Sequence, residues 1–257
     1  EWQDLTLPGI AQERGATHPL TQVHTKAMNV MRRLGFHLEE GPDIETPYYN
    51  FDALNIPENH PARDMQDTFW LPNQHLLRSH TTTVQARVLE KHPPLPIKVV
   101  AAGRVYRNEA VDATHLAMFH QFEGIWVEEG LTYGDLKGTL TEIAKSIYGE
   151  GHVFRFKPKY YPYTEPSVGM DMQCTVCLAK DPDCPACRGA GWITILGSGM
   201  IHPKVFIEFG YDHTKLSGIA FGIGTTRIAA QAAGMTALKP LYEQDLRVHR
   251  TIHRGGL

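Results

Sequence analysis

The sequence predicts an α+β fold, a mostly antiparallel sheet flanked by helices. A β-branched, apolar run at 97–106 and a second run at 118–127, separated by a polar loop, are typical of a wide antiparallel hairpin. Predicted helices and strands are mixed along the chain without the regular βαβ order of a parallel sheet. With 257 residues, of which 42% are hydrophobic, the chain is expected to form one large domain.

The domain is expected to begin with an amphipathic helix over residues 19–34. Apolar side chains recur there at helical spacing: Val23, Ala27, Val30, Met31 and Leu34. Thr17 is placed to cap this helix and Gly35 to end it. The polar stretch before it, residues 1–17, is interpreted as an extended lead-in, so that the domain spans 18–257.

The same patterns predict the remaining elements. Helices are expected at 82–91, 136–148 and 226–233. Strands are expected at 76–77, 153–157, 192–196, 204–209 and 218–224.

Composition narrows the class of protein. The formal net charge of −3 gives no overall field that would attract a polyanion. No run approaches about 18 consecutive apolar residues, and the first residues lack the basic start and apolar stretch of a signal peptide. We therefore expect a soluble, cytoplasmic protein that does not contact a membrane.

All four cysteines lie in one short insert, residues 174–191. Cys174, Cys177, Cys184 and Cys187 form two Cys-x2-Cys pairs separated by six residues. Four thiolates at this spacing suit tetrahedral zinc, and they leave no open position for water, so the metal would be structural. The alternative, four reduced buried cysteines, is disfavoured because Pro, Gly and Asp dominate the insert.

Charged residues follow the predicted strand 97–106 in the segment GRVYRNEA. Arg107 and Glu109 could simply pair with each other, but an arginine at a strand end also presents donors to a phosphate or a carboxylate. His115, in the loop that follows, could reach outer phosphates. Phe119, on the return strand, could lie beneath a purine or belong to the core.

A glycine-containing turn leads from strand to helix in GIAFGIGTTRIAAQ, residues 218–231. Arg227 lies near the start of that helix, and a helix amino terminus with an arginine suits a phosphate. The alternative is a tight turn with a solvated arginine. The segment is not a Walker loop, because no Gly-Lys-Ser/Thr follows.

These two segments resemble motifs 2 and 3 of class II aminoacyl-tRNA synthetases. The stretches NFDALNIPENHPARD, RSHTTTVQAR, GRVYRNEAVDATHLAMFHQFEG and GSGMIHPKVF resemble bacterial phenylalanine–tRNA ligase alpha subunits, and the resemblance covers nearly all of residues 17–235. It implies a class II synthetase-type antiparallel sheet with a zinc-binding insert. It also implies a ligase that uses ATP and Mg²⁺ to activate phenylalanine or a related aromatic amino acid and transfers it to tRNA, with a beta subunit and a dimer formed through the helix at 19–34.

The resemblance also assigns site residues. Arg107 would bridge ATP and the amino-acid carboxylate, and Arg107 and Arg227 would be catalytic. ATP would be held by Arg107, Glu109, His115, Phe119 and Arg227, with Phe119 and Arg227 on either side of the adenine. The amino-acid pocket would comprise His80, Thr82, Gln121, Glu123, Tyr161, Tyr163 and Ala220. Gln121 and Glu123 would face the α-amino group.

The sequence departs from the family at several of these positions. Tyr161 and Tyr163 replace phenylalanines, Gln66 replaces tryptophan and Thr82 replaces serine, so the pocket is expected to be more polar. Hydroxyls that face the substrate would favour a substituted ring, whereas hydroxyls that point away would leave phenylalanine preferred. Thr194 and Thr226 stand where glutamates are usual, and the loss of these two carboxylates is expected to weaken the binding of metal or ATP.

Two alternatives follow from these departures. One is a stand-alone paralogue that makes the adenylate without tRNA, since the sequence begins after the coiled-coil arm with which the family's alpha subunits grip tRNA. The other is a non-catalytic regulatory paralogue that binds an amino acid, although such a protein would have no need of both Arg107 and Arg227.

Overall fold

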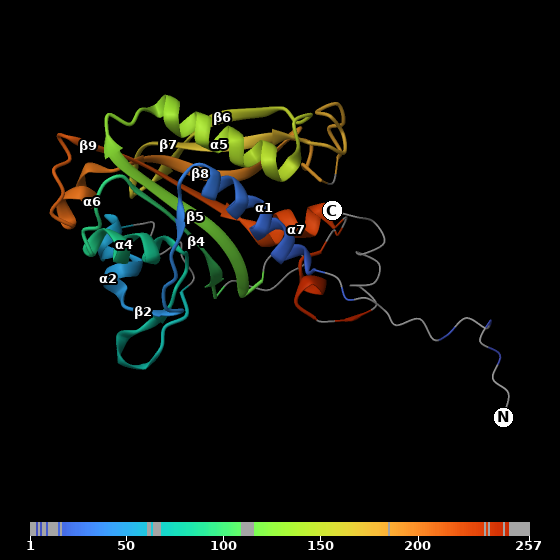
Figure 1. The fold of residues 1–257 in the computed structure, drawn as a ribbon, viewed down its shortest axis with the longest axis horizontal. Coiled ribbons are helices and arrows are strands. Elements are labelled where there is room, and N and C mark those ends of the chain that lie inside the picture. Colours follow the sequence, from blue (N-terminus) through green and yellow to red (C-terminus); the bar gives the residue numbers. More distant parts are fainter. Residues whose placement is uncertain are drawn as a thin grey trace.

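A seven-stranded sheet forms the centre of the computed structural model, which describes residues 4, 6, 9, 15, 17–60, 63, 68–108, 116–184, 186–233, 235, 237–243 and 245–246 (Figure 1). Its strand order is β1-β4-β5-β9-β8-β7-β6, and only β1 and β4 pair in parallel. The strands are β1 His37–Leu38, β4 Ile97–Tyr106, β5 Met118–Glu129, β6 Phe154–Tyr161, β7 Thr164–Gln173, β8 Trp192–Ile201 and β9 Leu216–Gly224. The expected α+β architecture is confirmed.

Three helices cover one face of the sheet: α1 Pro19–Arg33, α5 Tyr133–Tyr148 and α7 Thr225–Ala232 (Figure 1). Side chains alternate between the two faces along a strand, so Phe122 and Phe221 point into the core beneath these helices. Met31 and Leu140, from the helices, are fully buried against them.

Short elements pack on part of the opposite face. The helices there are α2 Pro47–Asn50, η1 Asp52–Leu54, α4 Thr82–Glu90 and α6 Pro203–Glu208, and β2 Ile44–Glu45 pairs with β3 Leu76–Leu77. Two further 3₁₀ turns are η2 Pro72–Gln74 and η3 Lys239–Leu241. Ile125 and Val127 of β5 join this second core, whereas the polar residues earlier on β5 do not.

The predicted first helix is confirmed with a different cap. α1 begins at Pro19, and the His18 ring accepts the Leu20 N–H at 3.2 Å, so His18 rather than Thr17 caps it. α5 begins three residues earlier than predicted, because Thr132 and Asp135 form a reciprocal capping box.

One prediction was wrong, and one long strand was missed. Residues 204–209 were expected to form a strand, but 203–208 form helix α6, whose first residue is Pro203 and whose cap is His202, accepting the Lys204 N–H at 3.1 Å. β7 was not predicted at all, since Glu165, Pro166 and Gly169 are poor strand formers. Pairing with β6 and β8 on both sides compensates for this local preference.

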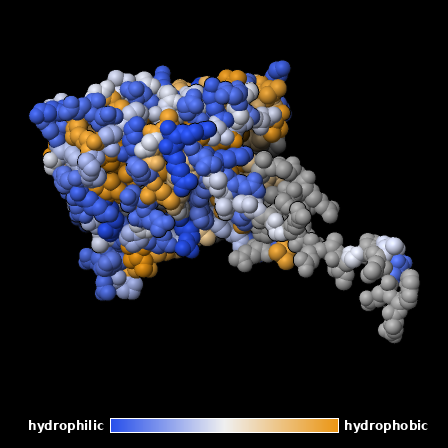
Figure 2. Space-filling view, viewed as in Figure 1, coloured by the Kyte–Doolittle hydropathy of each residue, from blue (hydrophilic) through white to orange (hydrophobic). Residues whose placement is uncertain are grey.

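The surface seen in Figure 2 is mainly hydrophilic, with smaller hydrophobic groups between. None of the helices in the described part of the chain is long and apolar enough to cross a membrane.

Candidate active site

A cavity of about 230 Å³ lies on the sheet face opposite α1, α5 and α7. It brings together seven of the predicted site residues from segments far apart in the sequence. These are Thr82, Arg107, Gln121, Glu123, Tyr161, Tyr163 and Ala220.

Strand alternation explains this grouping. Gln121 and Glu123 are two residues apart on β5 and therefore share a face. Glu123 pairs with Gly222 on β9, and Gly222 pairs with Gly197 on β8, so one row across the sheet starts at a carboxylate and continues over two glycines. The missing side chains leave room for a ligand beside Glu123.

Glu123 is the buried acid of the cavity, only 6% exposed. Burial raises the pKa of Glu123 to about 7, although the hydrogen bond from Thr82 and the charge of Arg107 oppose the shift. The Thr82 hydroxyl donates to Glu123 Oε2 at 2.6 Å. A carboxylate held in this way is suited to an ammonium group.

Gln121 and His80 each carry a buried side-chain atom without a hydrogen-bond partner among the described residues. Gln121 Oε1 is buried and has no hydrogen-bond partner among the described residues, so it offers a second acceptor to an ammonium group. His80 lies outside the cavity lining, and its Nε2 donates to the Asn50 carbonyl at 3.0 Å, which leaves Nδ1 as an acceptor. Burial and Arg107 lower the pKa of His80 to about 4, so the ring is neutral.

The predicted ATP-binding residues are only partly described. The guanidinium of Arg107 lies over the Phe119 ring, with 5.1 Å from Cζ to the ring centroid. Arg227 is exposed in the first turn of α7 and does not line the cavity. Glu109, His115 and Gln66 fall outside the described residues. The adenine site between Phe119 and Arg227 therefore stays a prediction.

Sequence reasoning missed part of the cavity lining. The additional residues are Gln85, Thr164, Gly197, Ser198, Phe221 and Gly222. The alternating glycines of the segment GSG, at 197 and 199, were the available signal, because they clear one face of a strand.

Thr194 bonds to a charged group on β6 and β7, none of whose members lines the cavity. Its hydroxyl donates to Asp171 Oδ1 at 2.7 Å, while Asp171 Oδ2 lies 2.9 Å from Lys157 Nζ and 3.2 Å from an Arg155 nitrogen. This carboxylate is thus already neutralised by protein cations. Among the described residues, the four cysteines are the only group of three or more His, Cys, Asp or Glu side chains that could hold a metal. Mg²⁺ is usually held by one or two carboxylates together with substrate phosphates, so its use with ATP stays a prediction.

Thr226, in contrast, has a structural role. Its hydroxyl accepts the His120 N–H at 2.8 Å, lies 2.8 Å from the Tyr242 hydroxyl and is buried, so it joins α7, β5 and the segment after η3.

Thr226→Val is therefore expected to lower the free energy of unfolding by about 1–3 kcal/mol, because it leaves the part-buried His120 N–H unpaired. Urea denaturation measures this. Thr141→Val is the matched control, since the Thr141 hydroxyl bonds only Lys137 within its own helix. Equal stability of the two variants would show that the hydroxyl of Thr226 has no structural role.

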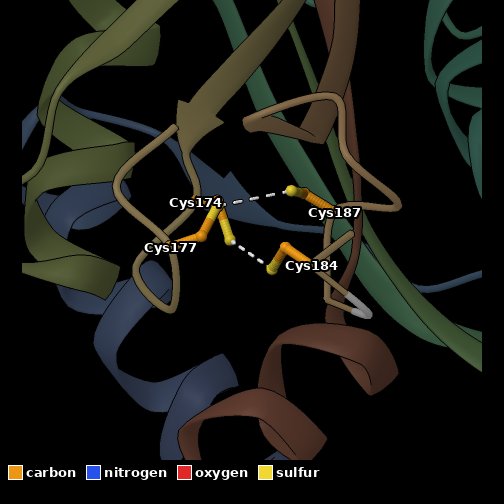
Figure 3. A group of neighbouring side chains, drawn as sticks. All are labelled: Cys174, Cys177, Cys184 and Cys187. Carbon is orange, nitrogen blue, oxygen red and sulfur yellow. Dashed lines mark hydrogen bonds between the residues drawn. The ribbon is translucent and has the colours of Figure 1, made fainter. Parts of the chain in front are cut away.

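The four cysteines come together in the insert between β7 and β8 (Figure 3). All four sulfurs lie within 4.8 Å of one another, with 3.9 Å between Cys174 and Cys184 and 3.6 Å between Cys177 and Cys187. Sulfurs placed tetrahedrally at about 2.3 Å from zinc are about 3.8 Å apart. The donor set therefore fits Zn²⁺ with no further ligand.

Comparison with known proteins identifies the family. Residues 2–252 match the family described as tRNA synthetases class II core domain (F). The phenylalanine–tRNA ligase alpha subunit of Syntrophus aciditrophicus is 48% identical over 244 residues, covering 95% of this chain and 71% of the relative. That of Moorella thermoacetica is 49% identical over 248 residues, covering 96% and 72%.

Solved structures support the fold alone. A pyrrolysyl-tRNA synthetase from Desulfitobacterium hafniense superposes with a TM-score of 0.63 at 16% identity, over 87% of this chain and 72% of that one.

The family match and the two alpha-subunit relatives confirm the predicted family. The chain belongs to the class II tRNA synthetase core-domain family, with phenylalanine–tRNA ligase alpha subunits as its relatives.

Proposed function

We propose that the protein activates phenylalanine or a related aromatic amino acid with ATP and transfers it to tRNA, as the alpha subunit of a phenylalanine–tRNA ligase. The observation that carries this proposal is that Glu123, Gln121 and Arg107 line one cavity together with the two tyrosine rings, in a chain of this family. A beta subunit as partner follows from the relatives. Dimerisation through α1 is implied by the resemblance of this chain to class II aminoacyl-tRNA synthetases.

The chemistry is an in-line displacement that needs no protein nucleophile. Glu123 and Gln121 would hold the α-ammonium group, which directs the amino-acid carboxylate toward Arg107. A carboxylate oxygen attacks the α-phosphorus of ATP, and pyrophosphate leaves. Arg107 would hold the two anions together, because its guanidinium can bond a carboxylate and a phosphate at once. Phenylalanine-dependent exchange of pyrophosphate into ATP tests this step, and its absence with every aromatic amino acid would contradict the proposal.

The KM for the amino acid is expected to fall about tenfold between pH 6 and pH 8. Below about pH 7 the free protein holds a proton on Glu123, and that proton must leave before the carboxylate binds an ammonium group. His80 and His120 have pKa values of about 4, so they do not titrate in this range. KM measured by pyrophosphate exchange across this pH range checks the expectation.

Glu123→Gln should raise the KM at least about thirtyfold and remove this pH dependence, since the amide cannot pair with the ammonium charge. Glu129→Gln is the control, because Glu129 is exposed at the far end of the same strand. A KM that keeps its pH dependence in Glu123→Gln would show that another group titrates.

A further inference from the structure

Two tyrosines lie at the active-site cavity. Tyr161 ends β6 and Tyr163 lies in the turn before β7, and their rings stack at 5.9 Å between centroids with 18° between planes. Both line the cavity. A Cβ at Gly197 would collide with the Tyr161 hydroxyl oxygen, so this glycine makes room for the hydroxyl on the cavity floor.

Neither hydroxyl is hydrogen-bonded to any residue in the described part of the chain. The neighbouring hydroxyls have partners: Thr164 and Ser167 lie 2.7 Å apart, and Ser198 donates to the Val168 carbonyl at 3.0 Å. Burial raises the pKa of Tyr161 and that of Tyr163, so both phenols keep their protons near neutral pH. Two donors therefore remain for a ligand.

The distance of the Tyr161 hydroxyl from the ammonium site fits the length of an aromatic amino acid. Glu123 and Gly197 lie in one row, two strands apart, which corresponds to about 10 Å. A substrate anchored at Glu123 would extend over Gly222 toward the hydroxyl that lies above Gly197.

We propose that Tyr161 and Tyr163 select a ring-hydroxylated phenylalanine as the preferred amino acid. This rests on the proposed adenylation function. An unsubstituted ring would displace water from both hydroxyls and leave them unpaired, whereas a ring hydroxyl supplies the missing partner.

The experiment compares kcat/KM for phenylalanine, tyrosine and meta-tyrosine in pyrophosphate exchange by the full chain. Wild type should favour one hydroxylated amino acid over phenylalanine at least about tenfold. Tyr161→Phe combined with Tyr163→Phe should reverse that ratio by raising activity toward phenylalanine. Tyr160→Phe is the matched control, because Tyr160 is 68% exposed and its hydroxyl lies 3.2 Å from His60, outside the cavity.

The outcomes separate this inference from the proposed function. Exchange that favours phenylalanine in wild type, with a ratio unchanged in the double variant, overturns the selectivity alone. No exchange with any of these amino acids overturns the proposed function, and calorimetric binding of the same three then decides selectivity. If wild type binds phenylalanine as tightly as it binds both hydroxylated amino acids, the proposed selectivity is overturned.

Discussion

Arg107→Ala is expected to lower kcat/KM for adenylate formation by at least about a thousandfold. Arg107 follows β4 directly, and its N–H donates to the Ala117 carbonyl at 2.9 Å, which continues the β4–β5 pairing and fixes the backbone from which its side chain lines the cavity. The amino-acid carboxylate and the α-phosphate repel each other as they approach. A guanidinium that bonds both offsets this repulsion where the charge develops, and pyrophosphate exchange measures the loss.

Arg104→Ala is the matched control for this substitution. Arg104 lies three residues earlier, on β4, with a side chain that is 58% exposed and 3.5 Å from Asp43, and it does not line the active-site cavity. Its removal should change kcat/KM by less than about twofold. Activity that survives in Arg107→Ala would show that Arg107 does not bridge the two anions. A different outcome would favour the non-catalytic regulatory alternative: wild type shows no exchange, and Arg107→Ala binds the amino acid as tightly as wild type does.

Local pattern was sufficient for the elements that build the centre of the sheet. β4 and β5 carry long β-branched and apolar runs, and α1 carries a helical stripe, so their positions follow from periodicity. It failed at α6, where local helix-start signals outweigh the strand-like composition. The segment of α6 contains the run Val205, Phe206 and Ile207, which has the composition of a strand, but the Pro203 start and the His202 cap make it a helix.

The candidate site shows the same division. Spacing alone suggested the zinc ligands, because the four cysteines lie in one short insert. The cavity residues come from α4, from the residue after β4, from strands β5 to β9 and from the β6–β7 turn. No local pattern relates these segments, and only the family resemblance grouped seven of the residues in advance. The direction of the Tyr161 hydroxyl was beyond either argument, since it depends on the space left by Gly197 on β8, two strands away in the sheet.

Removal of zinc is expected to unfold the insert while the rest of the domain stays folded. Cys174, Cys184 and Cys187 are buried mainly against one another and Ile193, in a cluster separate from the two main cores. Without a metal, little apolar surface holds this segment, and structural zinc contributes about 10–16 kcal/mol of apparent binding free energy in small zinc folds. Cleavage within 174–191 by a protease should therefore accelerate at least about a hundredfold on chelation.

Cys184→Ser should reproduce the effect of the chelator and reduce the zinc content below one ion per chain. Val176→Ala is the matched control, because Val176 lies between two of the ligands, is 69% exposed and provides no donor atom. Resistance to cleavage in the zinc-free protein would mean that the insert is held folded by its own packing.

Unfolding of the insert should also reduce pyrophosphate exchange, because Cys174 and Gly191 close the insert through a 2.9 Å backbone hydrogen bond next to β7 and β8. Loss of exchange without cleavage would instead indicate that zinc acts on the active site directly, which a closed site of four thiolates does not allow.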